Sequence, residues 1–345
     1  MFGIQVNSFE VKNFFAQKIG KSTFVWKIIE FLQGVSYSID YLLFYKFRLF
    51  KKASITEINI EFVSYCNLRC ILCSLDHEKT KVRMTAETLK HFFEDLLTDD
   101  RFSNLKTIHL YNAGEVLLHP KLEEMLDVIK YFKNFAKEKN IHFPKIALLT
   151  NATILDEENS NILIRSGILD NIRFSMDGGN KEKFEEMRLR AKWDDFVKNV
   201  TTFCELNKKS AKPIPTGIIT LVEYENKLNT KWMSEEFKKL LNMVNGYELR
   251  YAHNWGGEVE IEELKNKNKK GFKVGCSLLM HQLVLLPNGD VTVCCADLNS
   301  KGVIGNILND KLYAIYQKPL RVEMLRKFMK GKKKEIELCK DCETF

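Results

Sequence analysis

Three cysteines, Cys66, Cys70 and Cys73, have the spacing C-x3-C-x2-C and follow a short apolar run, residues 58–63. That run is typical of a buried strand, so the cysteines are expected on the loop before the next helix. Three thiolates can hold a four-iron, four-sulfur cubane at three corners and leave the fourth iron open to a small ligand. The triplet therefore predicts an iron–sulfur site that performs chemistry, whereas a fourth ligating cysteine would indicate an electron carrier.

A second group of cysteines lies towards the end of the chain. Cys276 is followed by twelve residues, Gly289, four residues and Cys294, and a C-x2-C pair follows at Cys339 and Cys342. Four thiolates could ligate a further four-iron cluster completely, or they could hold a structural zinc ion. The residues by themselves leave both interpretations open.

Composition narrows the class of protein. The chain has 345 residues, 45% of them hydrophobic, which permits one large α/β domain with an appendage. Its net charge of +8 is moderate, and no nucleic-acid partner is expected. Nine unevenly placed cysteines do not form a disulfide framework. Neither a signal peptide nor an uncharged run of about 18 residues is found, so we expect a cytoplasmic protein without membrane spans.

Strand and helix patterns alternate from residue 55 to about residue 255. The predicted strands are 58–63, 107–111, 145–150, 171–175, 216–222 and 247–253, and the predicted helices between them are 86–97, 122–135, 157–165, 184–187, 196–206 and 235–244. Strands separated by helices pair in parallel through right-handed crossovers. Such a sheet is either open and doubly wound or a curved, partial barrel, and in both cases ligands bind at the carboxyl ends of the strands.

The segments on either side have a different character. Residues 258–270 are rich in lysine and are expected to be a solvated linker, followed by a hairpin over 282–295 with an Asn-Gly turn and a helix over 312–328. Residues 1–54 form a preface with eight Lys or Arg and three acidic residues. Its apolar residues predict a pair of helices packed on the main domain. The alternative is an interfacial segment that makes peripheral contact with a membrane or a lipid-linked substrate.

Residues at successive strand ends, taken with the cysteine triplet, resemble those of radical S-adenosylmethionine (SAM) enzymes from about residue 57 onwards. Residues 112–115, Asn-Ala-Gly-Glu, occupy the place of the family's Gly-Gly-Glu motif, from which the chain departs at Ala113. The resemblance implies a partial (β/α)6 barrel in which SAM chelates the open iron. It also implies a set of residues around SAM: Leu72, Ala113, Gly114, Glu115, Asn151, Ser175 and Arg188.

These residues have distinct implied roles. Gly114 and Glu115 would receive the amino group of SAM, while Ser175 would bind its polar groups. Arg188 would pair with its carboxylate, because a guanidinium matches a carboxylate bidentately. Leu72 would pack near the adenine. An electron from the cubane would then cleave SAM to a 5′-deoxyadenosyl radical, which abstracts a hydrogen atom from the substrate.

The C-terminal cysteines resemble the SPASM/twitch extension of this family. The resemblance implies a small α+β domain with one auxiliary [4Fe-4S] cluster on Cys276, Cys294, Cys339 and Cys342. It selects Cys294 over its neighbour Cys295, which would face the other side of a strand. We expect three parts: the preface 1–54, a radical SAM core over 55–257, and a linker with the auxiliary domain over 258–345.

The resemblance indicates an oxidoreductase that dehydrogenates a small substrate related to a sugar or cyclitol. The auxiliary cluster would accept the second electron, and a low-potential donor such as a flavodoxin or ferredoxin would supply the first. The base is expected at the end of the sixth strand, where His253 and Tyr251 are candidates beside Arg250 and Glu258.

Two other functions remain open. A peptide maturase or epimerase would act on a peptide, with Cys204 or Cys295 returning a hydrogen atom in the epimerase; otherwise Cys204 is expected to be a buried small hydrophobe. A non-catalytic iron–sulfur or zinc protein would bind a partner or carry electrons.

Overall fold

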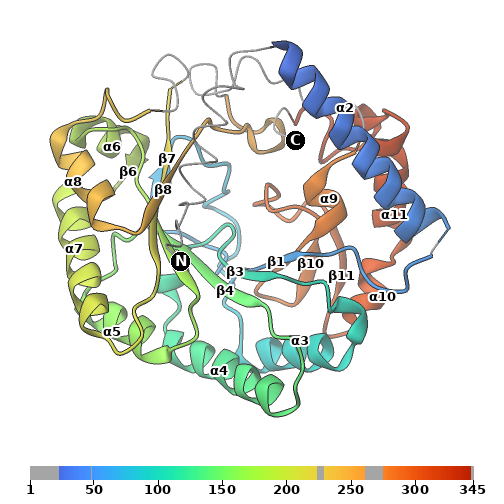
Figure 1. The fold of residues 1–345 in the computed structure, drawn as a ribbon, viewed down its shortest axis with the longest axis horizontal. Coiled ribbons are helices and arrows are strands. Elements are labelled where there is room, and N and C mark those ends of the chain that lie inside the picture. Colours follow the sequence, from blue (N-terminus) through green and yellow to red (C-terminus); the bar gives the residue numbers. More distant parts are fainter. Residues whose placement is uncertain (1–22, 48, 224–228, 261–274, 343–345) are drawn as a thin grey trace, which may run out of the picture.

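The computed structural model describes residues 23–47, 49–223, 229–260 and 275–342 (Figure 1). Side chains are described from residue 31 onwards in these ranges, and at Ile28.

One nine-stranded sheet organises the molecule, in the order β11-β10-β9-β1-β3-β4-β5-β7-β8. All six predicted strands are present: β1 (Glu57–Ile60), β3 (Thr107–Leu110), β4 (Lys145–Thr150), β5 (Asn171–Ser175), β7 (Thr216–Leu221) and β8 (Gly246–Arg250). Each pairs in parallel with its neighbour, as the crossover argument requires. The carboxyl ends of all six strands therefore lie at one edge of the sheet.

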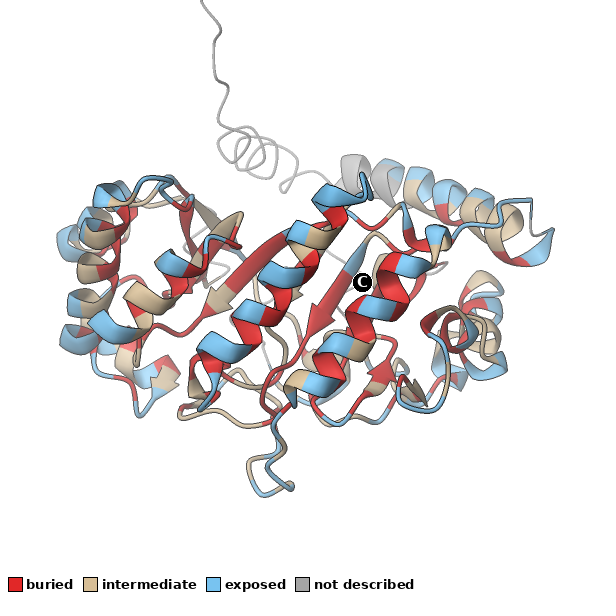
Figure 2. Cartoon of the chain, turned by 90° about the horizontal axis from the view of Figure 1, so that it is seen from below, coloured by how far each residue is buried: buried red, intermediate tan, exposed pale blue. Residues whose placement is uncertain are grey.

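Helices form an outer ring on one face of the parallel strands (Figure 1). They are α3 (Ala86–Thr98), α4 (Leu122–Glu138), α5 (Glu157–Ser166), α6 (Lys181–Met187), α7 (Trp193–Lys209) and α8 (Glu235–Met243). Four of them begin at a side chain that caps a free backbone N–H, namely Thr85, Asp156, Asn180 and Ser234. Their apolar faces turn inward (Figure 2), so the core lies between the helices and the sheet.

The C-terminal hairpin joins the same sheet. β9 (Gln282–Leu285) pairs in parallel with β1, and β10 (Asp290–Thr292) pairs antiparallel with β9 and with β11 (Val303–Asn306). Gly289 takes a φ of +87° in the predicted Asn-Gly turn, a conformation that favours glycine. The auxiliary region therefore continues the sheet of the core beyond its first strand.

The prediction of one helix over 312–328 is wrong. The structure has α10 (Leu312–Tyr316) and α11 (Pro319–Met329). Pro319 has no N–H and restricts Lys318 to an extended backbone, so one helix ends and the next begins there.

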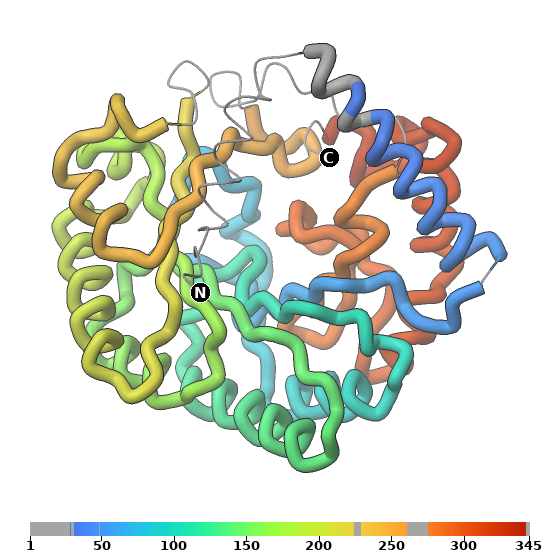
Figure 3. Tube along the Cα trace, viewed as in Figure 1, coloured from blue at the N-terminus to red at the C-terminus, as the bar shows by residue number. Residues whose placement is uncertain are grey.

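The preface contains α2 (Thr23–Asp40) and a π-helical turn η1 (Tyr41–Lys46). They lie beside the C-terminal helices, blue beside red in Figure 3, rather than on the barrel helices. Among the described residues, no helix combines the length and the apolarity needed to cross a bilayer. Most of the predicted linker, from residue 261, lies outside the described residues.

Candidate functional site

The cysteine triplet lies on the loop that follows β1. The loop contains a two-residue strand, β2 (Arg69–Cys70), which pairs with β6 (Arg188–Leu189) and so places Arg188 beside Cys70. All three cysteines are half-buried free thiols. Burial raises the pKa of each thiol, that of Cys66 to about 12. Thiols of this kind release protons when metal binds, and three of them on one loop fit three corners of a cubane.

Gly114 permits the closest approach in the site. A Cβ atom built there would stand 1.8 Å from the backbone oxygen of Val63, so no side chain fits. The backbone N–H of Glu115 donates to the oxygen of Tyr65, next to Cys66. The departure at Ala113 leaves this approach intact, because the critical position of the motif is Gly114.

Glu61, a buried acid that the sequence analysis missed, binds the start of the motif at residues 112–115. Its carboxylate accepts hydrogen bonds from Asn112 Nδ2 at 3.0 Å and from the backbone N–H of Ala113 at 3.1 Å. Burial raises the pKa of Glu61. The signal in the sequence was an acidic residue inside a mainly apolar strand-like run, residues 58–63.

The carboxylate of Glu115 points to the end of β4. It accepts hydrogen bonds from Thr150 Oγ1, from the backbone N–H of Asn151 and from that of Leu117, at 2.7–3.2 Å. These bonds join the ends of β3 and β4. Direct contact of Glu115 with the SAM amino group stays a prediction, and the structure adds a positioning role.

Asn151 connects β4 to the cysteine loop. Its Nδ2 donates to Asn67 Oδ1 at 3.0 Å and lies 3.6 Å from Cys66 Sγ. A hydrogen bond to a sulfur ligand is one means by which a protein tunes an iron–sulfur cluster. The amide therefore lies within the site and contacts the cysteine loop.

Arg188 forms an ion pair with Asp177. The distances from Arg188 Nη2 and Nε to Asp177 Oδ2 are 2.6 and 2.8 Å. Burial opposes the charge of Arg188, but Asp177 and the neighbouring thiol of Cys70 raise its pKa overall. The guanidinium is thus held charged beside the triplet, and its pairing with the carboxylate of SAM stays a prediction. Ser175 is half-buried at the end of β5.

The candidate bases lie in and after β8. The His253 ring lies 4.0 Å, between centroids, from Trp255, whose Nε1 donates to the Leu72 oxygen at 2.6 Å. His253 is thereby placed over the cysteine loop, and Tyr251 is half-buried against the core. Arg250 and Glu258 are held in ion pairs with Glu248 and Lys301.

The four C-terminal cysteines line one small, mainly apolar cavity. Cys276, Cys294, Cys339 and Cys342 share it with Leu279, Val293, Phe328 and Leu338 among others. Burial raises the pKa of Cys276 to about 11 and that of Cys339 to about 12. Within the described residues no three His, Cys, Asp or Glu side chains stand at the spacing of a single metal ion. A cubane bonds each thiolate to a different iron, and the cavity brings together the four thiols that the sequence analysis selected.

Cys295 does not line this cavity. Cys294 and Cys295 lie in a turn beyond β10 rather than on a strand, so the alternation argument was based on the wrong element. Cys295 instead contributes to the raised pKa of Tyr111, about 12, after burial. Its thiol is hydrogen-bonded to that of Cys294, and this contact raises the pKa of Cys294 and lowers that of Cys295. Cys204 is buried on α7 beside residues 213–216 at the amino end of β7, opposite to the cysteine loop.

Two family models match the chain. The radical SAM superfamily matches residues 60–228, and SPASM, an iron–sulfur cluster-binding domain, matches residues 276–343. A tungsten-containing aldehyde ferredoxin oxidoreductase cofactor-modifying protein of Pyrococcus furiosus is 30% identical over 119 residues, which are 34% of this chain and 30% of that protein. A GTP 3′,8-cyclase of Chlorobaculum tepidum is 25% identical over 147 residues, 42% of this chain and 40% of that protein. The match spans less than half the length of either relative.

Solved structures share the fold over most of the chain. BtrN in complex with AdoMet and 2-DOIA has a TM-score of 0.53 at 19% identity, covering 84% of this chain and 93% of that one. Streptococcus suis SuiB bound to the precursor peptide SuiA has a TM-score of 0.60 at 15% identity, covering 84% and 71%. With the two cysteine sets and both domain matches, the chain belongs to the radical SAM superfamily and carries a C-terminal SPASM domain.

Proposed function

We propose that this radical SAM enzyme is an oxidoreductase that removes two electrons from a small polar substrate bound on the concave side of its sheet. Membership of the superfamily implies a [4Fe-4S] cluster and SAM, and the SPASM domain implies auxiliary iron–sulfur chemistry. When bound, these groups supply a 5′-deoxyadenosyl radical and an acceptor for one electron.

The observation that carries the proposal is the four-thiol cavity. A cluster held by Cys276, Cys294, Cys339 and Cys342 has all four irons ligated by protein and leaves none for a substrate. Apolar side chains around it keep water away and favour electron transfer over ligand exchange. We therefore propose that a cluster in this cavity accepts the electron that remains on the substrate after hydrogen abstraction and deprotonation.

The lining of the concave face supports a small polar substrate. The buried Ile58, Ile108 and Ile172 face the helices, so the alternate residues of these strands face the other side. The alternate positions of β1, β3 and β5 are polar or charged at Glu57, His109 and Arg173, and Glu248 of β8 lies at an equivalent position. Ion-pair contacts link His109 to Glu57 and Arg173 to Glu248, at 3.6 and 3.5 Å.

With SAM bound, one substrate C–H bond would break and its hydrogen atom would become part of 5′-deoxyadenosine. A proton then passes to a base, for which we propose His253, or Tyr251 in its place. The auxiliary cluster, which Cys276, Cys294, Cys339 and Cys342 would hold, would supply an acceptor for the remaining electron, and the substrate would gain a double bond to carbon or oxygen.

Two further assignments belong to the proposal. A low-potential carrier such as a flavodoxin or ferredoxin would reduce the first cluster, and the enzyme would work in the cytoplasm, where thiols stay reduced. The complexes of BtrN with 2-DOIA and of SuiB with a peptide give two substrate classes to compare. The peptide class, with maturation or epimerisation, is the alternative.

Deuterium transfer tests the proposal. Anaerobically reconstituted enzyme is supplied with SAM, dithionite and carbon-deuterated aminocyclitols, aminosugars or peptides in separate reactions. With the aminocyclitols or aminosugars, we expect deuterium in 5′-deoxyadenosine. We also expect a product two mass units lighter than the unlabelled substrate. Transfer from a peptide alone, or a product that regains solvent hydrogen without net oxidation, would replace dehydrogenation by maturation or epimerisation.

A further inference from the structure

Helix α2 presents one face to the body of the protein and, among the described residues, leaves an apolar face exposed. On the inner face Tyr37 is buried, and its ring occupies the space beside Gly275, next to Cys276. Asp40 Oδ2 lies 3.4 Å from His281 Nε2. The inner face thus rests on the segment that carries Cys276, one of the four cysteines that line the auxiliary cavity.

The outer face of α2 is an exposed apolar stripe. Its residues recur at helical spacing and are 42–68% exposed: Ile28, Phe31, Leu32, Val35 and Ile39. At 100° per residue, these positions fall within an arc of about 100°. Figure 2 shows the helix along the edge of the molecule, with mostly intermediate and exposed residues over its described length. Surfaces of this kind mark an interaction site rather than ordinary surface variation.

The stripe continues into a segment that combines apolar and basic side chains. Phe47, Leu49 and Phe50 are 50–67% exposed. Three lysines, Lys46, Lys51 and Lys52, are exposed around them. Together, the five stripe residues and these six residues, Lys46, Phe47, Leu49, Phe50, Lys51 and Lys52, are called the apolar–basic strip below.

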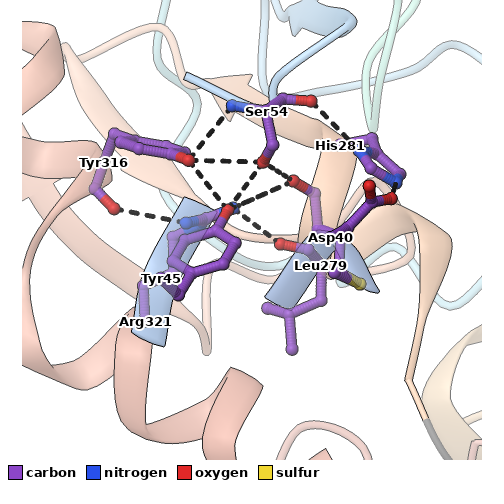
Figure 4. Close-up of polar contacts among 8 residues, drawn as sticks. Asp40, Tyr45, Ser54, Leu279, His281, Tyr316 and Arg321 are labelled. Carbon is purple, nitrogen blue, oxygen red and sulfur yellow. Dashed lines mark hydrogen bonds and ion pairs between the residues drawn. The ribbon is translucent and has the colours of Figure 1, made fainter. Parts of the chain in front are cut away.

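A buried polar network fixes the strip to the body of the protein (Figure 4). Arg321 of α11 has no exposed surface, and its Nη2 donates to Tyr45 Oη at 3.0 Å and to the Leu279 oxygen at 2.8 Å. Ser54 Oγ lies 2.7 Å from Tyr45 Oη, and the Arg321 guanidinium lies 4.5 Å from the centre of the Tyr316 ring. Because an unsatisfied buried guanidinium is costly, this network disfavours detachment of η1.

We infer that the apolar–basic strip binds the surface of an anionic lipid bilayer, with α2 lying in the plane of the headgroups. The apolar stripe would enter the boundary between headgroups and acyl chains, and the lysines would contact lipid phosphates. The inner face of α2 rests on protein, whereas the outer face is exposed in the part of the chain that the structure describes, which fits a helix lying on the bilayer. The strip includes an excess of basic residues, complementary to an anionic surface.

Vesicle sedimentation tests this inference with the reconstituted holoenzyme. The vesicles contain phosphatidylcholine alone or phosphatidylcholine with 30% phosphatidylglycerol, at low and high salt. We expect binding to the anionic vesicles only, weakened by salt. Lys46→Gln, Lys51→Gln and Lys52→Gln together should weaken it roughly a hundredfold, at about fivefold per lysine. Phe31→Gln with Leu32→Gln should abolish detectable binding.

Matched substitutions elsewhere on the surface serve as controls. Leu308 and Tyr131 are 53% and 64% exposed and lie outside the strip, so Leu308→Gln and Tyr131→Gln should bind vesicles like the wild type. The charge control is the triple variant Lys130→Gln, Lys137→Gln and Lys139→Gln, with two lysines on α4 and one directly after it. Iron content and thermal unfolding confirm that each variant is folded.

Three results would overturn the inference. The first is that the wild type does not bind anionic vesicles. The second is that the strip variants and the control variants lose binding to the same extent. The third is a dimer in sedimentation velocity that Phe31→Gln with Leu32→Gln converts to a monomer, without vesicle binding by the wild type. That result would assign the stripe to a second copy of the chain. None of these outcomes depends on the proposed oxidation.

Discussion

The two cysteine sites of this chain differ in what surrounds their thiols. The triplet after β1 is surrounded by polar groups from several strand ends, including the amide of Asn151 and the guanidinium of Arg188. The four C-terminal cysteines line a cavity whose other walls are mainly apolar. Polar, charged surroundings suit a site that receives a charged cofactor, whereas an apolar enclosure suits a site that exchanges only electrons.

The number of thiols also distinguishes a site that receives a cofactor from a site that exchanges only electrons. Three leave an iron open to SAM, and four leave none. Both kinds of site lie on one continuous sheet, because β9 pairs directly with β1. Substitutions that affect one site and spare the other can break or sharpen this division.

The largest effect is expected from Cys70→Ala. Loss of one of three ligands should reduce the formation of 5′-deoxyadenosine at least about a thousandfold, since that chemistry needs the cluster. Chromatographic quantitation after reduction with dithionite measures it. Cys204→Ala, on the far side of the barrel, should stay within about twofold of the wild type. Normal SAM cleavage by Cys70→Ala would remove the triplet from its assigned role.

Gly114→Ala should disrupt the site around the cysteine triplet by displacing the backbone. The new Cβ would stand 1.8 Å from the Val63 oxygen, so β1 and the motif after β3 must separate. We expect SAM binding to be lost and the free energy of unfolding to fall by about 1–3 kcal/mol. Gly34→Ala is the matched control, because nothing lies within 4 Å of its Cβ and the change favours the helix. Urea unfolding measures the free energy of unfolding, and a titration measures SAM binding. If the two variants behaved alike, the close approach of Gly114 to the Val63 oxygen would be contradicted.

Asp177→Asn should have a smaller, more selective effect. It removes the charge that orients Arg188, so we expect the KM for SAM to rise about tenfold with little change in iron content. Asp194→Asn removes a surface pair with Lys181 and should leave the KM unchanged. A fall in kcat without a change in KM would show that Arg188 acts elsewhere than on the SAM carboxylate.

The smallest effect concerns the buried thiol that belongs to neither site. Burial raises the pKa of Cys204 to about 11 from 9.0. The unfolded chain therefore loses this proton first as pH rises, and the folded state loses stability between about pH 9 and pH 11, by roughly 1 kcal/mol per pH unit. Below pH 9 the contribution is fully present. In Cys204→Ala the unfolding free energy should decline less over this window, and an identical decline would contradict the assignment.

Much of the fold was predictable because the signals were local. Six strands and their helices follow from short apolar runs, and the Asn-Gly turn and the cysteine spacings are local as well. The continuation of the sheet through β9 was not predicted, since pairing of β9 with β1 joins segments more than two hundred residues apart. The break at Pro319 was a local signal that the sequence analysis overlooked.

The site divides in the same way. The cysteine positions were set by spacing, and the structure brings each predicted set together. Glu61, Asp177 and Trp255 were missed because their importance depends on partners distant in sequence: Asn112, Arg188 and Leu72. The direction of the Glu115 carboxylate, towards Thr150, likewise depends on two strand ends meeting.

The iron content of two variants tests the central claim, that the chain holds two separate clusters with different work. The account predicts about eight irons in the reconstituted wild type and about four in both Cys70→Ala and Cys339→Ala. Only Cys339→Ala should still cleave SAM, without forming oxidised product. Loss of all iron in either variant, or zinc in place of four irons in the Cys70→Ala protein, would contradict it.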